Sequence, residues 1–528
     1  MTEWQPGGSE PKRVSRRSLL RAAGVGSVSA ALVTGGFRST IAAPSAGHSS
    51  GRRASFQNDF DFKIPDSGAQ LPTGDVQLHW MDSGDAKAFF FKAFFPAYQK
   101  QHPNIKVQYE GTNWNQIQQV VTLGFRNGSA PDVFQLPSTI TMADAVKNTW
   151  VGALDDIVPN WAEVKGRFPV GTFADGVTDF GGKTYGYPAT SNKRIGSLLL
   201  FNNDYLTKAG YGPASAVISW DDFRAAAKKC TEQGKGKYYG LIAGVTQNNA
   251  LPGAINALAE TAGAAGGEFN LKTGTYNYTT DQYIGAVELI LAIKADGSFF
   301  PGTTSLDNPG ARGRMPQGVA AMILQGPWNI MPWTQQNPDF HLGVGMTPQM
   351  NPEEIHPTTY GPGGSNTWAY FSKSQLGSAI GDIFSYMGTV DGQAAWGHFV
   401  GAGDPPQFPE ALEQIQLDPL SKKALDLGFK WTRLRPEPSV RNPDVQKVYL
   451  EEKPLTPSWN DVMVGLFTGQ LTDVKQSLQD LQDRATKARE EAIKAAQDKG
   501  AKVSHDDFVF ADWDPMKDYA PITATPVP

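Results

Sequence analysis

Short apolar runs alternate with stretches of helical periodicity in the first part of the chain. Runs of four to six residues flanked by turn residues predict strands, and apolar residues three and four apart predict helices. By these rules we expect strands at 76–80, 105–110 and 131–136, with helices at 86–101 and 114–125 between them. Strands alternating with helices at this spacing are typical of βαβ units, so the pattern predicts a parallel sheet and an α/β fold.

The same alternation continues through the middle of the chain. We expect strands at 195–201, 241–245, 319–324, 341–346 and 367–371, and helices at 221–231, 248–264 and 280–296. After about residue 375 the pattern becomes almost entirely helical. In an open α/β sheet, ligands bind at the carboxyl ends of the strands, so the loops at 82–85 and 135–139 are candidate binding loops.

A long amphipathic helix is predicted near the C-terminus, from about 470 to 499. Its apolar residues recur at alternating spacings of three and four: Leu471, Val474, Leu478, Leu481, Ala485 and Ala488. Such a stripe fits either packing against its own domain or a coiled-coil seam, and three heptads barely suffice for the latter. The Pro/Thr-rich tail, 501–528, is expected to wrap the surface or to be loose.

The first 46 residues resemble an export signal. A basic region is followed by a mild apolar stretch, Ala22–Val33, and by small residues near Ala42 that suit a cleavage site. The segment Ser15–Leu20 (SRRSLL) resembles a twin-arginine signal, the alternative being a Sec signal with a chance Arg16–Arg17 pair. No cysteine lies near the cleavage region. We therefore expect an exported protein, periplasmic or extracellular, without a lipid anchor. Residues 47–73 have no periodicity and are predicted to be a linker.

Composition excludes several classes of function. The chain has 528 residues with 47 Lys+Arg against 52 Asp+Glu, a balance that argues against a nucleic-acid-binding surface. Its 40% hydrophobic and 19% charged residues argue against disorder, and no apolar run suits a membrane span. The only cysteine, Cys230, permits no disulfide within the chain and no thiolate metal cluster, so we expect no metal and no cofactor.

Catalytic motifs are absent from the sequence. It contains no HExxH, GxSxG or P-loop pattern, and the glycine-rich turn at 361–364 lacks the Lys-Ser/Thr that a P-loop requires. A pair of carboxylates for glycoside hydrolysis leaves no local motif and stays possible among 52 acidic residues. We therefore predict a protein that is not an enzyme. A secreted carbohydrate-active hydrolase or lyase is the alternative.

Aromatic residues beside turns suggest carbohydrate binding. A flat indole can cover the C–H face of a sugar while polar side chains satisfy its hydroxyls. Trp328 follows Gly326 and Pro327 at the end of the predicted strand 319–324 and fits this role. The alternative is a core tryptophan at a tight turn.

The chain resembles the extracellular solute-binding proteins of carbohydrate ABC transporters, the family that includes the maltose-binding proteins. The resemblance covers about residues 74–495 and rests on segments that occur in the family's order. They are VQLHWMDSGD, NGSAPDVFQLP, YGYPATSNKRIGSLLLFNNDYLTKAG, ISWDDFRAAAKK, GVAAMILQGPWNI, YGPGGSNTWAYFSKS and PSWNDVMVGLFTGQLTDVKQSLQDLQDRA. The chain is long for the family, its loop at 189–194 is expanded, and the tail after 500 has no recognised counterpart.

The resemblance implies two α/β lobes, open sheets with helices on both faces, and a ligand cleft between them. One lobe would hold 74–187 and 347–400, and the other 188–346 and 401–500. The ligand would be a sugar or oligosaccharide, with a polyol or glycerol phosphodiester as a variant, passed by a monomer to permease subunits. The implied ligand-binding residues are Asp82, Ser83, Asp85, Gln135, Ser138, Asn192, Arg194, Trp328, Gly363, Gly364, Ser365, Asn366 and Trp459.

Overall fold

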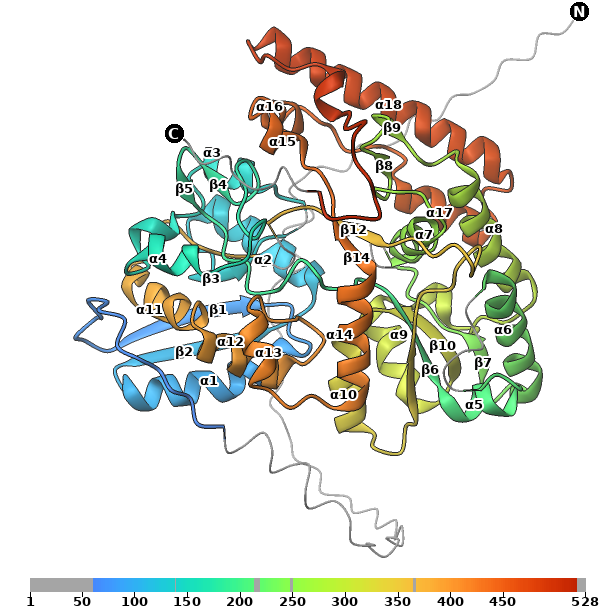
Figure 1. Cartoon of the computed structure of the whole chain (residues 1–528), viewed down its shortest axis with the longest axis horizontal. Helices are drawn as coiled ribbons and strands as arrows, with labels where there is room; N and C mark the ends of the chain where they lie inside the picture. The colour runs from blue at the N-terminus through green and yellow to red at the C-terminus, as the bar shows by residue number, and fades with distance from the viewer. Residues whose placement is uncertain (1–59, 138, 213–218, 247–249, 364–366, 520–528) are drawn as a thin grey trace, which may run out of the picture. The chain divides into compact units, whose positions relative to one another are not determined.

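This computed structural model describes residues 60–137, 139–212, 219–246, 250–363 and 367–519 (Figure 1). The predicted export signal and residues 47–59 of the predicted linker lie outside these residues. Two four-stranded sheets organise residues 60–519, each covered by its own helices. We call each sheet with its packed helices a lobe.

The first lobe is built on the sheet order β13-β3-β1-β2. Its strands are β1 (Val76–Asp82), β2 (Ile105–Gly111), β3 (Val133–Gln135) and β13 (Trp368–Tyr370). β1 pairs in parallel with both β2 and β3, which confirms the predicted βαβ arrangement, whereas β13 is antiparallel to β3.

Helices cover both faces of the first sheet. Trp80 on β1 points into a core with α1 (Lys87–Gln101), α11 (Gly377–Met387) and α12 (Val390–Val400), while its neighbour Met81 packs with α2 (Trp114–Asn127). Alternate residues of a strand point to opposite faces, so one strand serves both cores. The aromatic face of α1 supplies most of the first core through Phe90, Phe91, Phe94 and Phe95. Smaller elements complete the lobe: α3 (Met142–Lys147), α4 (Trp161–Gly166), β4 (Asp179–Phe180), β5 (Lys183–Thr184) and α13 (Pro409–Glu413).

The second lobe is built on the sheet order β11-β6-β10-β7. Its strands are β6 (Leu198–Asn202), β7 (Tyr239–Leu241), β10 (Ala320–Gln325) and β11 (Leu342–Gly345). β6 is antiparallel to both of its neighbours, and β10 is parallel to β7. The strand predicted at 241–245 instead ends at Leu241. The amide of Ile242 still donates to the carbonyl of Met322 on β10, but the amide of Val245 donates to the carbonyl of Leu306 in a loop, so the pairing does not extend that far.

Two hydrophobic cores flank the second sheet. The larger contains α6 (Trp220–Gly234), α7 (Ala250–Thr261), α8 (Asp281–Ala295), α17 (Trp459–Thr468) and α18 (Val474–Asp498). The other contains α9 (Asn308–Arg314), α10 (Ile330–Gln336) and α14 (Pro419–Trp431). The long helix α18 packs its apolar stripe on α8 and α17, so packing against its own domain is the correct alternative (Figure 1). The remaining helices are α5 (Asn203–Lys208), α15 (Pro438–Arg441) and α16 (Val445–Tyr449).

The chain passes between the lobes in three segments. The first runs from the first core at Ala189 to the second at Ile195, and another returns from β11 to β13. The last segment follows α12 and crosses between the lobes more than once. Ala402 packs in the second lobe, Phe408 and Ala411 pack in the first lobe, and α14 lies again in the second lobe. β12 (Thr358–Tyr360), on the segment from β11 to β13, pairs in parallel with β14 (Thr432–Leu434), which follows α14. A single lobe boundary at residue 400 therefore simplifies the path of the chain.

Both ends of the described chain pack onto the lobes. Phe60 and Phe62, in the predicted linker, contact the first core, and the ring of Phe62 stacks on Phe399 at 5.7 Å. At the other end, the side chains of Phe510 and Trp513 are buried. The tail thus wraps the surface as far as residue 519. Among the helices of the described ranges, none combines the length and hydrophobicity of a membrane span.

Candidate ligand-binding site

A cavity of about 1030 Å³ has walls from both lobes. The first lobe contributes the start of α2, the residues after β3 and the chain before β13. The second lobe contributes the starts of α9 and α17 and the chain around a small hairpin, β8 (Phe269–Asn270) with β9 (Thr275–Tyr276). The lining residues are Trp114, Asn115, Gln118, Leu136, Pro137, Thr139, Ile140, Met142, Val177, Thr178, Arg194, Glu268, Tyr278, Asn308, Gly363, Thr367, Leu455, Ser458, Trp459 and Asn460.

Two tryptophans from opposite lobes line the cavity, and each is the first residue of a helix. Trp114 begins α2, which is capped by the side chain of Asn113, and Trp459 begins α17, which is capped by Ser458. The two differ in burial: Trp114 is half-buried, whereas Trp459 is 5% exposed and belongs to the larger core of the second lobe. Trp114 therefore offers more ring surface to a ligand.

A hydrogen-bonded network forms the second-lobe wall. Glu268 accepts from the hydroxyl of Tyr278 at 2.6 Å and from the amide of Asn256 at 2.9 Å. Asn256 in turn accepts from the indole N–H of Trp459 at 3.4 Å. Burial, with Glu268 as the next cause, raises the pKa of Tyr278 far above its usual range, so its hydroxyl stays a donor. The network fixes one carboxylate and two aromatic rings at the cavity surface.

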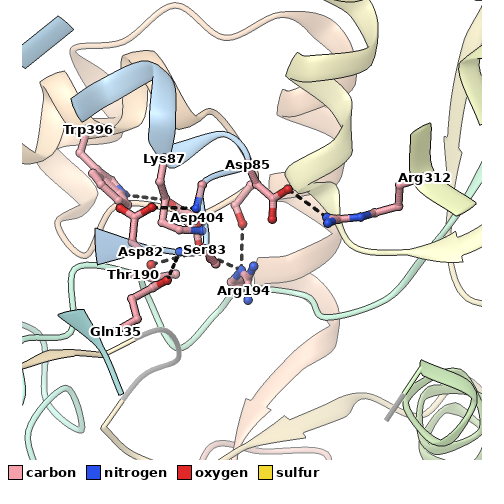
Figure 2. Close-up of polar contacts among 12 residues, drawn as sticks. Asp82, Ser83, Asp85, Lys87, Gln135, Thr190, Arg194, Arg312, Trp396 and Asp404 are labelled. Carbon is pink, nitrogen blue, oxygen red and sulfur yellow. Dashed lines mark hydrogen bonds and ion pairs between the residues drawn. The ribbon is translucent and has the colours of Figure 1, made fainter. Parts of the chain in front are cut away.

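Arg194 is a cation that lines the cavity from the first segment between the lobes. Its Nε donates to the carbonyl of Gly403 at 2.8 Å and lies 3.1 Å from the carboxylate of Asp404 (Figure 2). Its guanidinium lies over the ring of Trp328, 4.4 Å from the centroid. These contacts hold the guanidinium in place from two sides.

Trp328 itself does not line the cavity. Its indole folds back over Gly326, where an added Cβ would lie 1.9 Å from the ring, and one ring face is covered by Arg194. The residue is half-buried. In this structure its contact is with the cation, so it supports a cavity residue.

Buried charges lie behind the cavity, at the end of β1. Lys87 and Arg194 both contact the carboxylate of Asp404, Lys87 at 3.3 Å (Figure 2). Asp82 is fully buried and accepts from the amide of Gly84 at 2.7 Å and the hydroxyl of Tyr109 at 2.8 Å. Burial raises the pKa of Asp82 to about 6, against the opposing charge of Lys87.

An ion pair joins the lobes beside this cluster. Asp85, in the loop after β1, lies 3.1 Å from Arg312 on α9 (Figure 2). Asp85 has a positive φ of 55° and follows Gly84 at 65°, a tight turn that aims its carboxylate toward the second lobe. Asp85 is thus engaged with Arg312.

Apart from Asp85 and Trp328, which are described above, the predicted site residues fall into three groups. Arg194, Gly363 and Trp459 line the cavity. Asp82, Ser83 and Gln135 are engaged behind it, where the amide of Ser83 donates to Gln135 at 2.7 Å. Asn192 donates to the carbonyl of Gly171, which also accepts from the amide of Gly363, so Asn192 supports a cavity residue. Ser138, Gly364, Ser365 and Asn366 lie outside the described residues, although their neighbours Pro137, Thr139, Gly363 and Thr367 line the cavity.

Sequence reasoning missed several lining residues. Trp114 stood in a predicted helix next to a capping residue, a signal that could have marked it. Glu268 and Tyr278 flank a two-strand hairpin that no periodicity indicated. Behind the cavity, the pair Lys87 and Asp404 was also missed, because its members meet across 317 positions of sequence. Contacts at such separation leave no local pattern.

Comparison with known families decides the class of protein. The family model described as bacterial extracellular solute-binding protein matches residues 85–394, more than half of the chain. The chain belongs to this family. A relative in Brucella abortus (strain 2308), a binding protein whose name is itself provisional, is 26% identical over 276 residues. That match covers 52% of this chain and 63% of the relative, so the chain spans less than two thirds of the length of the curated relatives it matches.

Solved structures show the fold of this solute-binding protein. The solute-binding protein of an ABC transporter from Thermotoga lettingae, bound with alpha-D-tagatose, has a TM-score of 0.59 at 16% identity. It is matched over 79% of this chain and 100% of its own. The maltose-bound MalE3 of T. maritima has a TM-score of 0.57 at 16% identity, over 78% of this chain and 99% of its own. The α/β fold with two lobes and mixed open sheets is therefore confirmed. Within the described ranges, no three His, Cys, Asp or Glu side chains are grouped as metal ligands.

Proposed function

We propose that this solute-binding protein captures a sugar or oligosaccharide in the cavity between its lobes and delivers it to the permease of an ABC transporter. The observation that supports this most is the lining: two tryptophans face one cavity from opposite lobes, among amide, hydroxyl and carboxylate side chains. Sugars need this combination of apolar rings and hydrogen-bonding groups. Two proteins of the same fold hold tagatose and maltose, which supports the same class of ligand.

The size of the cavity favours an oligosaccharide. Ligand pockets of about 300–1,000 Å³ suit drug-sized molecules. At about 1030 Å³, this cavity is at the upper end of that range. Trp114 would supply a stacking face, Arg194 and Asn460 hydrogen bonds, and Trp459 a ring edge. Asp82, Ser83, Asp85, Gln135, Asn192 and Trp328 would act through the residues they hold.

A ligand screen tests the proposal. We would heat-release any bound molecule from the purified protein, identify it by mass spectrometry, and titrate maltose, tagatose and chitin oligosaccharides by calorimetry. At a 100-fold excess over Kd, a true ligand should raise the free energy of unfolding by about 2.7 kcal/mol. A glycerol phosphodiester is a second candidate because Arg194 places a cation in the cavity. Its binding, with no response to any sugar, would contradict the sugar proposal. Recovery of the sugar unchanged excludes hydrolysis.

We propose export by the twin-arginine route. The support is the Arg16–Arg17 pair in an SRRSLL context ahead of a weakly apolar stretch. Changing both arginines to lysine should leave the precursor in the cytoplasm, as measured by cell fractionation. Normal export of that variant would indicate the Sec route. We further propose that the exported protein acts as a monomer.

A further inference from the structure

The C-terminal strap, which we define as residues 501–519, follows α18 along the second lobe. It has little regular structure but is held by specific contacts. The guanidinium of Arg441 donates to three strap carbonyls and lies over the ring of Phe510, 3.7 Å from its centroid. Trp513 is 1% exposed. A segment anchored in this way is part of the folded lobe.

The middle of the strap packs on the hairpin that carries part of the cavity wall. The amide of Phe510 donates to the carbonyl of Leu271 at 2.7 Å, next to β8. On the hairpin turn, a Cβ added to Gly274 would lie 2.6 Å from Val509 of the strap. The cavity residues Glu268 and Tyr278 flank this hairpin on either side. The strap therefore supports the wall from behind.

The end of the strap reaches the first connecting segment and β14. Both carboxylate oxygens of Asp518 lie 2.6 Å from the ammonium of Lys193, and one accepts from the amide of Leu434 on β14 at 2.8 Å. Lys193 also donates to the carbonyl of Thr432. Burial alone would raise the pKa of Asp518, but Lys193 and the Leu434 amide hold the pKa below its usual value. One carboxylate thus ties the first connecting segment to β14, whose partner strand β12 lies on the second connecting segment.

We propose that Asp518 is a positioning residue for ligand capture. It fixes Lys193 against β14 and thereby fixes the next residue, Arg194, in the cavity wall. This role rests on the proposed function. Asp518 lies outside the cavity and acts on it through Lys193 and Arg194. Hinge motions are absorbed by a few residues in connecting segments, so a clamp that joins the first segment to β14, and through β14 to β12 on the second segment, restricts the angle between the lobes.

A matched control lies four residues away. Asp514 is in the same strap, and its side chain is 47% exposed against 48% for Asp518. It pairs only within the strap, with Lys517 at 3.0 Å and the amide of Met516 at 3.0 Å. Asp514→Asn and Asp518→Asn therefore remove the same charge at equal exposure, but only the second releases Lys193 and β14 from the strap.

The experiment measures the distance between the lobes without a sugar. Spin labels at Lys100→Cys on α1 and Lys228→Cys on α6, both exposed positions, report this distance in the full-length protein; Cys230 is buried. Asp518→Asn should broaden the distance distribution and speed amide exchange at 191–195 and 432–434 by about two- to five-fold, the scale of an exposed ion pair. Asp518→Glu should restore both, and Asp514→Asn should change neither.

Two results would overturn the proposal. One is an unchanged distance distribution and unchanged exchange in Asp518→Asn. The other is equal broadening in Asp518→Asn and Asp514→Asn, which would mean general loosening of the strap. A fall in melting temperature without either local change would indicate a purely structural role and also count against it. Because no measurement needs a sugar, failure of the sugar proposal would leave this test intact.

Discussion

The two tryptophans of the cavity illustrate how burial separates a binding role from a packing role. Trp114 is half-buried, so Trp114→Ala removes ring surface that faces the cavity. Covering about 100 Å² of a sugar at about 25 cal/mol per Å² contributes about 2.5 kcal/mol, so we expect affinity to fall by one to two decades. The melting temperature without ligand should change by only a few degrees. Titration calorimetry and a melting curve check both.

Trp459→Ala is the comparison at the opposite wall. At 5% exposure, and packed against Tyr278 at 5.3 Å, its loss should lower the free energy of unfolding by about 3–5 kcal/mol. Chemical denaturation measures this directly. Equal stability losses in the two variants would contradict the assignment of Trp114 to the ligand.

Asp82 makes stability depend on pH. Its pKa is about 6 in the folded protein, against 3.8 for an ordinary aspartate side chain. Between these values the folded state keeps a proton that the unfolded state releases, so Asp82 makes the protein less stable as pH rises. Relative to Asp82→Asn, the free energy of unfolding of the wild type should fall by up to about 3 kcal/mol from pH 4 to pH 7. Parallel stability curves would show that Asp82 does not titrate in this range.

At the residue scale, sequence could identify kinds of residue but not their partners. Arg194 and Trp459 follow from matched motifs and do line the cavity. Trp328 was predicted to meet the ligand, yet its ring contacts Arg194, 134 positions away, and this contact depends on how two segments cross in three dimensions. The pattern of hydrophobic and polar residues in the sequence does not indicate where two segments cross.

At the scale of elements, the long helix α18 shows what periodicity captures well. Leu478 and Leu481 are fully buried against α8 and α17. Leu481→Ala should therefore lower the free energy of unfolding by about 2–5 kcal/mol. Lys475→Ala, on the exposed face of the same helix, should change it by less than about 0.5 kcal/mol. Denaturant titration of both variants checks the expectation, and similar losses would contradict the assigned face.

Strands and helices with a strong period were predicted nearly to the residue, while short elements were not. β1 was predicted at 76–80 and spans Val76–Asp82. The hairpin β8–β9 has two residues in each strand, too few for any period, and it packs against the strap, which is far away in the sequence. The strand ending at Leu241 was placed too late because buried loop residues such as Val245 are as apolar as a strand.

At the scale of the whole molecule, the Asp85–Arg312 pair is expected to favour the closed arrangement of the lobes. The side chains are 29% and 17% exposed, so the pair is worth about 0.2–1 kcal/mol. Arg312→Gln should shift the ligand-free population toward open forms by about two- to five-fold and enlarge the radius of gyration in small-angle scattering. Arg224→Gln, which breaks a 2.6 Å pair with Asp296 inside the second lobe, is the control and should leave the radius unchanged.

The three connecting segments have a consequence for how the protein can be taken apart. A protease that nicks one of them leaves the lobes covalently joined through the other two. The nicked chain should therefore migrate as fragments in a denaturing gel but elute intact from a sizing column. Each core is assembled from chain segments that are separated in the sequence by segments of the other lobe. Cutting the gene at any single position therefore does not yield a fragment that encodes one complete lobe.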